Sequence, residues 1–233
     1  MKAVIMAGGE GMRLRPFTYV LPKPLLPVGD ISPIEYSIRY LKNNGFKEII
    51  ISTNYLKEKF NICYKFAEEY GIKLHLIDED VKLGTAGSLD LMREYLTEPF
   101  VVLNGDLLAQ PPYKAMFQTM NDGNADILIG VKKHFTQIPY GTITFDAENN
   151  LLEIYEKPKI EHWINSGIYL LDPRVLNYIE HQTYLDMPSL IERVESNGKV
   201  KVHDIGENWL DIGKVEDYES ASLVLHSWVD IHS

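Results

Sequence analysis

The chain of 233 residues contains only one cysteine, Cys63, which excludes an intramolecular disulfide and a cysteine-rich zinc site. It lacks any apolar run near the roughly 18 residues that span a bilayer, and the opening run Met1–Met6 is too short for a signal-peptide core. Basic residues are few, 23 against 33 acidic ones, for a net charge of −10. Sequence-independent binding to nucleic acid or anionic lipid needs a basic face. We therefore expect a cytoplasmic protein with neither nucleic acid nor a membrane as partner.

What the chain does contain is typical of a folded domain, with 45% hydrophobic and 24% charged residues. The first half alternates β-rich runs with segments of helical periodicity. We expect strands at 2–6, 48–52, 73–77 and 100–103, and helices starting at Pro33, spanning about 56–70, and spanning 88–95. Strand–helix alternation with short joins indicates a mostly parallel sheet covered on both faces. The prediction is a Rossmann-like three-layer α/β/α fold.

After about Asp126 the pattern changes, because strands now follow one another with few helices between them. These strands are expected at 126–131, 141–145, 151–155 and 165–171. We interpret them as antiparallel additions to the parallel sheet. Helices are expected again at 173–180 and 187–196, then a strand near 199–203 and a helix from about Val215. No linker, internal repeat or low-complexity stretch interrupts this order, and no hexapeptide repeat occurs.

A glycine-rich loop follows the first expected strand, and the two informative runs are Met6-Ala7-Gly8-Gly9-Glu10-Gly11-Met12-Arg13-Leu14-Arg15-Pro16 and Pro22-Lys23-Pro24-Leu25-Leu26-Pro27-Val28. Glycines let backbone N–H groups approach an anion closely, because no Cβ stands in the way. A plain tight turn is the alternative. The clustering of Arg13, Arg15 and Lys23 in an acidic chain favours a phosphate site instead. Arg13 offers a planar fork to phosphate oxygens, and Lys23 offers a point charge.

Two other phosphate-binding patterns do not fit this loop. No Gly-Lys-Ser/Thr follows it, which excludes a P-loop ATPase. A dinucleotide-binding unit has a different glycine spacing and an acidic residue at the end of its second strand. The run Ile49–Thr53 ends without such a residue, so NAD binding is not expected.

The two runs resemble the signature of the sugar-1-phosphate nucleotidylyltransferases, and the mannose-1-phosphate guanylyltransferases among them. One position departs from it, because Met12 stands where threonine or serine is usual. The resemblance implies a single nucleotidyltransferase domain over 1–233, with a nucleotide-binding half over about 1–125 and a sugar-binding half over about 126–233. It also implies catalytic roles on the phosphates for Arg13 and Lys23, and nucleotide binding by Ala7, Gly8, Gly9 and Gly11.

A second loop of small residues, Leu83-Gly84-Thr85-Ala86-Gly87-Ser88, leads into an expected helix. By itself it reads as a helix start, but the resemblance places it against the nucleobase and makes Gly84, Thr85 and Gly87 base-contact candidates. The acidic run Asp78–Asp80 precedes it. A carboxylate can accept hydrogen bonds from the N1–H and the amino group of guanine, whereas thymine and uracil offer no such pair of donors. We therefore favour GTP, with Glu79 as the reader of the base.

Two aspartates follow strand-like segments and sit beside a glycine. Asp106 stands in Asn104-Gly105-Asp106, and Asp211 stands in Trp209-Leu210-Asp211-Ile212-Gly213. An Asx turn alone would explain the first of them. Both match the metal-ligand positions of the family, which implies catalytic roles for both and a Mg²⁺ cofactor held by Asp106 and Asp211. Mg²⁺ is commonly bound by one or two carboxylates together with substrate phosphates.

Three motifs of the second half carry the remaining candidates: Tyr140-Gly141-Thr142, Tyr155-Glu156-Lys157-Pro158 and Ile164-Asn165-Ser166-Gly167. Without context, Glu156 and Lys157 read as a solvated charge pair. In the family, the matching glutamate and asparagine hold sugar hydroxyls, the lysine reaches the sugar phosphate, and the glycine lets the ring approach the backbone. The resemblance thus implies a sugar-phosphate site formed by Gly141, Glu156, Lys157 and Asn165.

The expected reaction transfers a nucleoside monophosphate from a nucleoside triphosphate to a sugar 1-phosphate and releases pyrophosphate. Mannose 1-phosphate is the first candidate, and heptose or hexosamine 1-phosphates compete with it because no side chain identifies a hydroxyl pattern. A uridylyl- or thymidylyltransferase is the alternative within enzymes, and a non-catalytic sensor of nucleotide sugars is the alternative outside them. The expected partners are these small molecules, and a homo-oligomer stays open.

Overall fold

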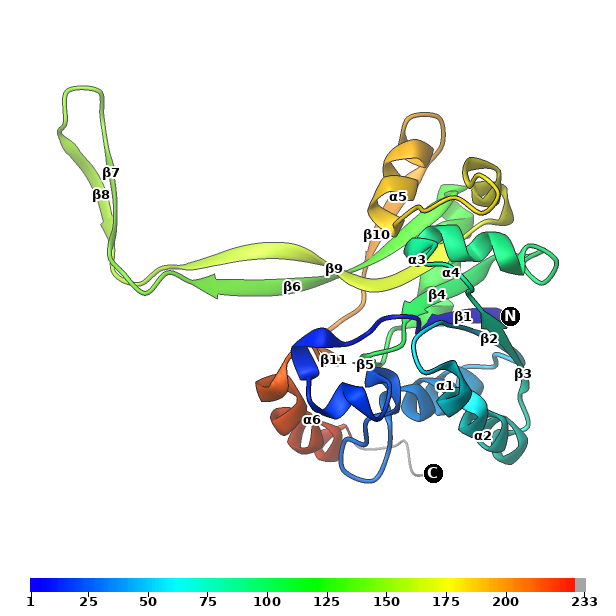
Figure 1. Ribbon diagram of the computed structural model, residues 1–233. Coiled ribbons are helices and arrows are strands. Elements are labelled where there is room, and N and C mark those ends of the chain that lie inside the picture. Colours follow the sequence, from blue (N-terminus) through cyan, green and yellow to red (C-terminus); the bar gives the residue numbers. More distant parts are fainter. Residues whose placement is uncertain (229–233) are drawn as a thin grey trace.

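A seven-stranded sheet in the order β10-β6-β9-β4-β1-β2-β3 forms the centre of the computed structural model, which describes residues 1–228 (Figure 1). Strands β4, β1, β2 and β3 run parallel, β9 is antiparallel to β4 and β6, and β10 is parallel to β6. The predicted mostly parallel sheet is confirmed, with β9 as an antiparallel addition, whereas the strands expected at 141–145 and 151–155 do not join it. The strands are β1 (Lys2–Met6), β2 (Glu48–Thr53), β3 (Lys73–Asp78), β4 (Phe100–Asn104), β6 (Ile127–Gln137), β9 (Lys159–Leu171) and β10 (Val200–Asp204).

Helices cover both faces of this sheet, because neighbouring strand residues point to opposite sides. Ile5 packs in one buried cluster with α1 (Pro33–Asn43), α2 (Ile62–Tyr70) and α4 (Tyr113–Gly123). Val4 packs in the opposite cluster with the one-turn helix α3 (Gly84–Gly87), the 3-10 helix η6 (Pro173–Tyr178) and α5 (Met187–Glu195). The fold is therefore the predicted three-layer α/β/α arrangement. Within residues 1–228, none of the helices is long and apolar enough to cross a membrane.

Local chemistry explains where the predicted helices begin and end. The hydroxyl of Ser32 accepts a hydrogen bond from the Glu35 amide at 3.4 Å, and Pro33 fills the first helical position of α1. Gly71 ends α2 with a φ of 66°, a conformation that costs glycine little. Both boundaries were expected from the residue types, and the structure confirms them.

Several elements differ from the sequence prediction. The helix expected at 88–95 is instead the single turn α3 followed by the 3-10 helix η5 (Ser88–Met92). The helix expected at 173–180 is the 3-10 helix η6. Leu56, the first residue of the helix expected over about 56–70, lies outside that helix because its φ is 50°. No element was predicted for α4, although Tyr113, Met116 and Met120 form its buried helical stripe. The paired strands β5 (Leu107–Ala109) and β11 (Trp209–Asp211) are too short to show a period-2 pattern.

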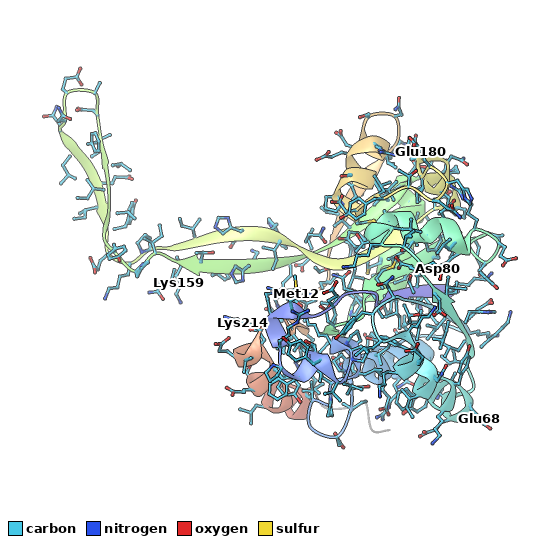
Figure 2. The ribbon with its side chains drawn as sticks, viewed as in Figure 1. Met12, Glu68, Asp80, Lys159, Glu180 and Lys214 are labelled. Carbon is cyan, nitrogen blue, oxygen red and sulfur yellow. The ribbon has the colours of Figure 1, made fainter. Side chains whose placement is uncertain are left out.

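A long arm projects from the sheet and is the largest departure from the prediction (Figure 1). Strands β6 and β9 continue beyond the body as a paired ribbon from Lys132 and Ile164 to Gln137 and Lys159. The ribbon ends in a hairpin of β7 (Thr142–Phe145) and β8 (Leu151–Tyr155), which is a separate two-stranded sheet. In Figure 2 the side chains of the arm, among them the labelled Lys159, project into solvent. The strands predicted at 126–131 and 165–171 are thus the inner parts of longer strands.

The last helix, α6 (Val215–Ser227), lies against the N-terminal loops rather than against the sheet. Its residues Ala221 and Leu225 pack with Leu14, Val28 and Tyr36 in a third buried cluster. This packing holds the strand β11, and with it Asp211, beside the loop that follows β1.

Candidate active site

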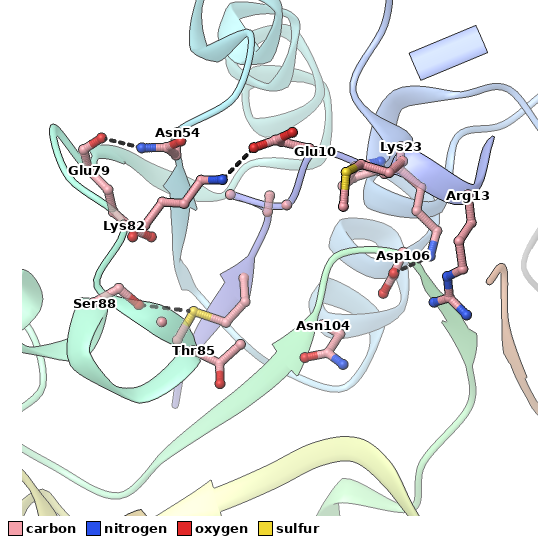
Figure 3. A pocket seen from close by; sticks show the side chains of 18 of the residues that line it. Glu10, Arg13, Lys23, Asn54, Glu79, Lys82, Thr85, Ser88, Asn104 and Asp106 are labelled. Carbon is pink, nitrogen blue, oxygen red and sulfur yellow. Dashed lines mark hydrogen bonds and ion pairs between the residues drawn. The ribbon is translucent and has the colours of Figure 1, made fainter. Parts of the chain in front are cut away.

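A pocket of about 670 Å³ opens at the carboxyl ends of the parallel strands (Figure 3). Loops after β1, β2, β3 and β4 all contribute to its wall. Ligands bind at this edge in open α/β sheets, and the volume suits a nucleotide-sized molecule. The lining includes these predicted nucleotide-binding or catalytic residues: Ala7, Gly8, Gly9, Gly11, Arg13, Lys23, Glu79, Gly84, Thr85 and Asp106.

Gly11 in the glycine-rich loop approaches its neighbours more closely than a side chain would allow, whereas a Cβ on Gly8 would make ordinary contacts and one on Gly9 none within 4 Å. A Cβ on Gly11 would lie 2.8 Å from the Thr18 Cγ2 atom, and Gly11 has a φ of 60°. A Cβ on Gly8 would lie 3.4 Å from the side chains of Asn54 and Glu79. No acceptor in the described residues takes a hydrogen bond from the backbone amides of Gly8, Gly9, Glu10 or Gly11. The loop therefore offers several free N–H groups to an anion.

Lys23 links the two predicted metal ligands. Its ammonium pairs with Asp106 and lies 3.7 Å from Oδ1 of Asp211, although only 8% of the residue is exposed. The antiparallel pairing of β11 with β5 places Asp211 opposite Leu107, directly beside Asp106. The sequence prediction that these aspartates lie together is in line with this geometry.

Asp211 is less readily ionised in this arrangement than an ordinary aspartate. Burial raises the pKa of Asp211 above its ordinary value, and the neighbouring Asp106 carboxylate raises that pKa further. Lys23 and Arg13 act in the opposite direction. A cation between the two carboxylates would relieve both effects.

The donor set fits a cation that is shared with a ligand. Within residues 1–228, no group of three or more His, Cys, Asp or Glu side chains could hold a metal ion. Asp106 supplies a carboxylate to the wall of a pocket with room for phosphates, and Asp211 stands beside it without lining the pocket. Mg²⁺ accepts such an incomplete set, because waters and substrate phosphates fill its other positions.

Positively charged side chains lie on two sides of the pocket. Figure 3 shows Arg13 beside Lys23 and Asp106, whereas Lys82 stands across the cavity and pairs with Glu10. Arg15 does not line the pocket, contrary to the expected cluster. The Arg15 guanidinium lies 3.4 Å from Glu10 and 5.0 Å from the centre of the Tyr19 ring. Arg15 follows the short 3-10 turn and is two positions after Arg13, so its side chain projects to the other side of that turn.

Glu79 is held firmly at the end of the pocket away from the aspartates. Only 9% of the residue is exposed. The Ser52 hydroxyl donates to its Oε1 at 2.5 Å, and the Leu83 amide donates to its Oε2 at 3.4 Å. The Asn54 side chain donates to its carbonyl oxygen at 2.7 Å. The carboxylate is therefore fixed in orientation while it faces the cavity.

The loop of small residues at 84–87 packs against the segment 183–187. A Cβ on Gly84 would lie 2.5 Å from the Leu185 carbonyl oxygen, and one on Gly87 would lie 2.5 Å from the Thr183 carbonyl oxygen. The Thr85 hydroxyl accepts a hydrogen bond from the Met187 amide at 2.9 Å. Gly87 does not line the pocket. Close backbone packing is thus one reason for the small residue types in this loop.

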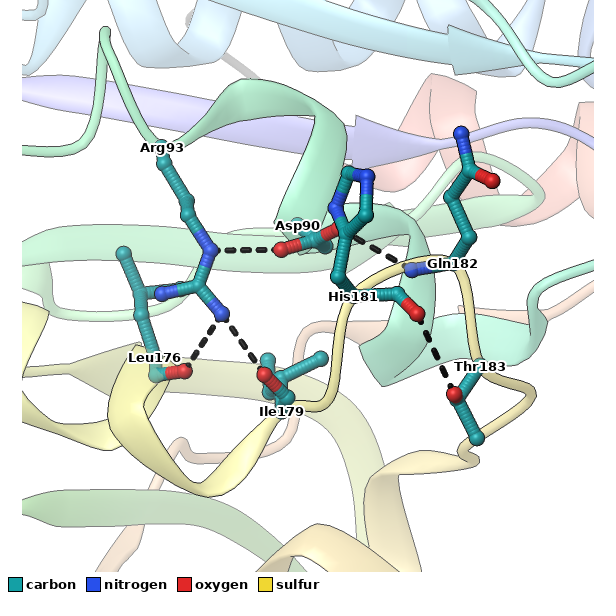
Figure 4. A network of polar contacts seen from close by, with 7 residues as sticks. All are labelled: Asp90, Arg93, Leu176, Ile179, His181, Gln182 and Thr183. Carbon is teal, nitrogen blue, oxygen red and sulfur yellow. Dashed lines mark hydrogen bonds and ion pairs between the residues drawn. The ribbon is translucent and has the colours of Figure 1, made fainter.

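A polar network around the buried Asp90 carboxylate anchors the same segment (Figure 4). The Asp90 carboxylate accepts from Arg93 Nε at 2.5 Å and from the Gln182 amide at 3.2 Å, and His181 Nδ1 lies 2.7 Å from it. Arg93 also donates to the carbonyl oxygens of Leu176 and Ile179 at 2.8 and 2.7 Å. This network fixes the chain that places Tyr184 in the pocket wall.

The predicted sugar-phosphate residues lie elsewhere. Gly141, Glu156 and Lys157 are exposed residues beside the tip hairpin of the arm, and no arm residue lines the pocket. Asn165 stands at the base of the arm, where its amide donates to the Tyr169 hydroxyl at 2.8 Å. The chain itself therefore does not bring these four residues together with the aspartates.

Sequence reasoning did not single out Asn54, Lys82, Asn104 or Tyr184, which also line the pocket. Asn54 and Asn104 carried a usable signal, because each stands where an expected parallel strand ends. Lys82 lies between two motifs that were recognised. Tyr184 offered no local signal, because the anchored segment 176–187 brings it to the pocket from the other half of the chain.

Comparison with protein families shows that the model of the nucleotidyl transferase family matches residues 2–227. A probable mannose-1-phosphate guanylyltransferase 1 of Oryza sativa subsp. japonica is 35% identical over 226 residues, which cover 94% of this chain and 63% of the relative. A mannose-1-phosphate guanyltransferase of Saccharomyces cerevisiae is 34% identical over 235 residues, which cover 96% of this chain and 64% of the relative. The chain thus spans less than two thirds of the length of these relatives.

Solved structures of similar size also match. HddC from Yersinia pseudotuberculosis shares 27% identity with a TM-score of 0.74, and the match covers 96% of this chain and 99% of HddC. The same protein has also been solved complexed with GMP-PN. A putative glucose-1-phosphate thymidylyltransferase from Bacillus anthracis in complex with a sucrose shares 25% identity with a TM-score of 0.77, covering 96% of this chain and 94% of that one.

Proposed function

The chain belongs to the nucleotidyl transferase family, and on that premise we propose that it transfers a nucleoside monophosphate from a nucleoside triphosphate to a sugar 1-phosphate. One observation carries the proposal: the free amides of the glycine loop, Lys23 and Arg13 line the same pocket as Asp106. Such a pocket suits phosphates that must be neutralised while they react. The names of the similar proteins, which include guanylyltransferases and a thymidylyltransferase, support the same reaction class.

The reaction needs positioning more than proton transfer. A phosphate oxygen of the sugar 1-phosphate attacks the α-phosphorus, and the bond from that phosphorus to the bridging oxygen of the β-phosphate breaks. Pyrophosphate leaves with the bonding electron pair. The attacking oxygen is already largely ionised at neutral pH, so no general base is required. The amides of Gly8 to Gly11 hold phosphate oxygens, Arg13 holds the departing pyrophosphate, and Lys23 neutralises the reacting phosphates.

Asp106 and Asp211 are the proposed ligands of a divalent cation, with Mg²⁺ as the proposed ion. When bound, such an ion supplies positive charge to the phosphate oxygens. The Lys23 ammonium pairs with Asp106 and lies 3.7 Å from Asp211, so it holds the two carboxylates near each other. Burial and the Asp106 carboxylate raise the pKa of Asp211, and a bound cation would offset that repulsion.

We propose GTP as the preferred triphosphate, with Glu79 as the residue that reads the base. Ser52 and Leu83 donate to the carboxylate and fix its plane. Its remaining acceptor capacity suits the N1–H and amino donors of guanine. The guanylyltransferase names of the relatives support this choice. A uridylyl- or thymidylyltransferase is the second candidate, because a structurally similar protein is named a thymidylyltransferase.

The proposed sugar-phosphate residues are Gly141, Glu156, Lys157 and Asn165. With them we propose a nucleotide-binding half over about 1–125 and a sugar-binding half over about 126–233. Mannose 1-phosphate is the first candidate substrate, followed by heptose and hexosamine 1-phosphates. Glu156 and Asn165 offer acceptors and donors for sugar hydroxyls, and Lys157 offers a charge for the phosphate. The proposed location of the protein is the cytoplasm.

A pyrophosphate-release panel tests this function. Each of GTP, ATP, UTP and dTTP is combined with mannose, heptose, glucose and N-acetylglucosamine 1-phosphates, with and without Mg²⁺. We expect turnover with GTP and one of these sugars, dependent on Mg²⁺. The Asp106→Asn variant should lose about a hundredfold in kcat, because a group that stabilises the reacting phosphates is worth about 3 kcal/mol.

The panel also separates the alternatives. Preference for UTP or dTTP would assign the chain to the second candidate. Binding of a nucleotide sugar without pyrophosphate release from any pair would point to a non-catalytic sensor. Near-normal Mg²⁺-dependent turnover by Asp106→Asn would remove this aspartate from the metal site.

A further inference from the structure

The tip of the arm has an apolar face on which no other part of the described chain packs. Ile143 and Ile154 are paired across β7 and β8, so they share one face of the hairpin. Phe145 lies two residues from Ile143 along β7, and its partner across the hairpin is Leu151, after a register shift between Thr144 and Phe145. Between 56% and 64% of each of these four residues is exposed. A two-stranded hairpin with an uncovered apolar face is at best marginally stable in water.

The ribbon that carries the tip also lacks a covering layer. Phe135 and Trp163 are 54% and 53% exposed on it. Figures 1 and 2 show the arm standing clear of the body along its whole length. The ladder between β6 and β9 is continuous from Lys132 to Gln137, so the straight ribbon carries the tip away from its own pocket.

The body has a matching surface beside its pocket. In the segment Met12–Val20, four apolar side chains are 50% to 71% exposed: Met12, Phe17, Tyr19 and Val20. Met12 also lines the pocket. The segment carries two arginines and no acidic residue, whereas residues 138–158 of the arm tip carry four acidic residues and one lysine. The two surfaces are therefore complementary in charge as well as apolar.

We propose that a second copy of this chain receives the arm, so that two chains exchange arms and each tip packs on the segment Met12–Val20 of the other copy. This inference rests on the proposed function, because it completes that site: Glu156 and Lys157 of one copy reach the pocket that Asp106 of the other copy lines, beside Asp211. Each copy contributes one arm and one pocket, so the exchange closes as a two-fold dimer. The active site is then shared between chains.

The arrangement explains two features that a single chain does not. The pocket is complete on its nucleotide side, with Glu79, Lys23 and Asp106, yet no residue of the arm lines it. Three of the four proposed sugar-phosphate residues, Gly141, Glu156 and Lys157, stand beside the tip of the arm, yet they face solvent. The exchange covers the apolar tip and joins the two halves of the site in one step.

Mixed dimers test where the arm acts. Two variants are co-expressed with different tags, and the heterodimer is isolated by sequential capture on both tags. Asp106→Asn damages the pocket, and Lys157→Met damages the arm. If the arm acts in the other copy, the dimer of these two variants has one intact site and about half the wild-type turnover. A dimer of wild type with the double variant Asp106→Asn/Lys157→Met should then be inactive, because each of its sites contains one damaged part.

The reverse pattern overturns the proposal. An arm that folds onto its own pocket leaves the first dimer inactive and the second at about half of wild-type turnover. Failure of the tags to capture each other, with a monomeric mass for the active wild-type protein, overturns it as well. No turnover by wild type with any substrate pair is a failure of the proposed function instead.

A measurement that does not depend on activity keeps the exchange testable in that case. Light scattering gives the mass, and hydrogen exchange gives the protection of residues 142–155 and 12–20. We expect a dimer with both segments protected, and a monomer with both exposed in Ile143→Ser/Ile154→Ser. Leu223→Ser, which changes a 74% exposed leucine outside both surfaces, serves as control and should stay dimeric. Equal protection in the monomeric variant and the wild type would refute the exchange.

Discussion

Replacing Gly87 with alanine has two opposite effects on the stability of the fold. Gly87 has helical dihedrals, φ −61° and ψ −31°, so alanine should stabilise the local turn by about 1 kcal/mol through its helix propensity. The added Cβ, however, would lie 2.5 Å from the Thr183 carbonyl oxygen and 3.1 Å from the Leu185 amide nitrogen. These are backbone atoms held by the network around Asp90, and they cannot rotate away as a side chain could.

The size of the net effect follows from what must move. Overpacking of this kind costs about 1–3 kcal/mol. The displacement would also weaken two hydrogen bonds, from the Ala86 and Gly87 amides to the Leu185 carbonyl oxygen, each 2.9 Å long and worth about 1 kcal/mol. The cost exceeds the gain, and we expect Gly87→Ala to lower the free energy of unfolding by about 2 kcal/mol.

Urea unfolding checks this, with Gly123→Ala as the matched control. Gly123 also lies at a helix position, but a Cβ there would meet only the flexible end of the Lys201 side chain, at 2.7 Å. The control should therefore be neutral or stabilised by up to about 1 kcal/mol. For a chain of this size, about 2 kcal/mol lowers Tm by roughly 4–8 °C. If Gly87→Ala were as stable as the control, the packing of this loop on residues 183–187 would be wrong.

Three further predictions concern single side chains. Burial opposes ionisation of Asp90, yet the hydrogen bonds from Arg93 and the Gln182 amide hold its pKa below the usual range. The ionised carboxylate therefore stabilises the fold above the unfolded pKa, and this contribution is lost as pH falls through the lower folded pKa. In urea unfolding, Asp90→Asn should lower the free energy of unfolding by about 2–3 kcal/mol at pH 7 and by much less at pH 3. A pH-independent loss would contradict the charged network. Glu79→Gln should lower kcat/KM for GTP by at least about tenfold relative to UTP, because an amide cannot accept both guanine donors; an unchanged GTP/UTP ratio would remove Glu79 from base reading. Burial raises the pKa of Cys63 to about 12, so the native thiol should not react with a thiol-specific disulfide reagent at pH 8, and rapid labelling would show that helix α2 opens.

Periodicity and the chemistry of turns were enough to predict the layered fold. Parallel strands buried on both faces read as continuous apolar runs, and the caps at Ser32 and Gly71 act within a few residues. The order of the motifs also predicted the pocket wall, because the glycine loop, Glu79 and Asp106 follow β1, β3 and β4, and the carboxyl ends of parallel strands share one edge of the sheet.

Short and irregular elements were not predictable in this way. Strands β5 and β11 are three residues each, and only their pairing brings Asp211 beside Asp106. The turn at α3 becomes helical because Leu185 accepts from its amides. In both cases the stabilising contact comes from a residue far away in the chain, and local propensity does not register it.

The amino-acid sequence by itself determined the family, the three-layer core, the phosphate-binding loop and the residue types of the site, because these depend on local pattern and residue chemistry. Only the tertiary structure decided where those residues lie. It placed Lys23 between two aspartates and turned Arg15 away. It also carried Glu156 and Lys157 out on an arm, because the pairing of β6 with β9 runs on beyond the body. Strand pairing over a long distance is a property of two segments together, and neither segment alone encodes how far it extends.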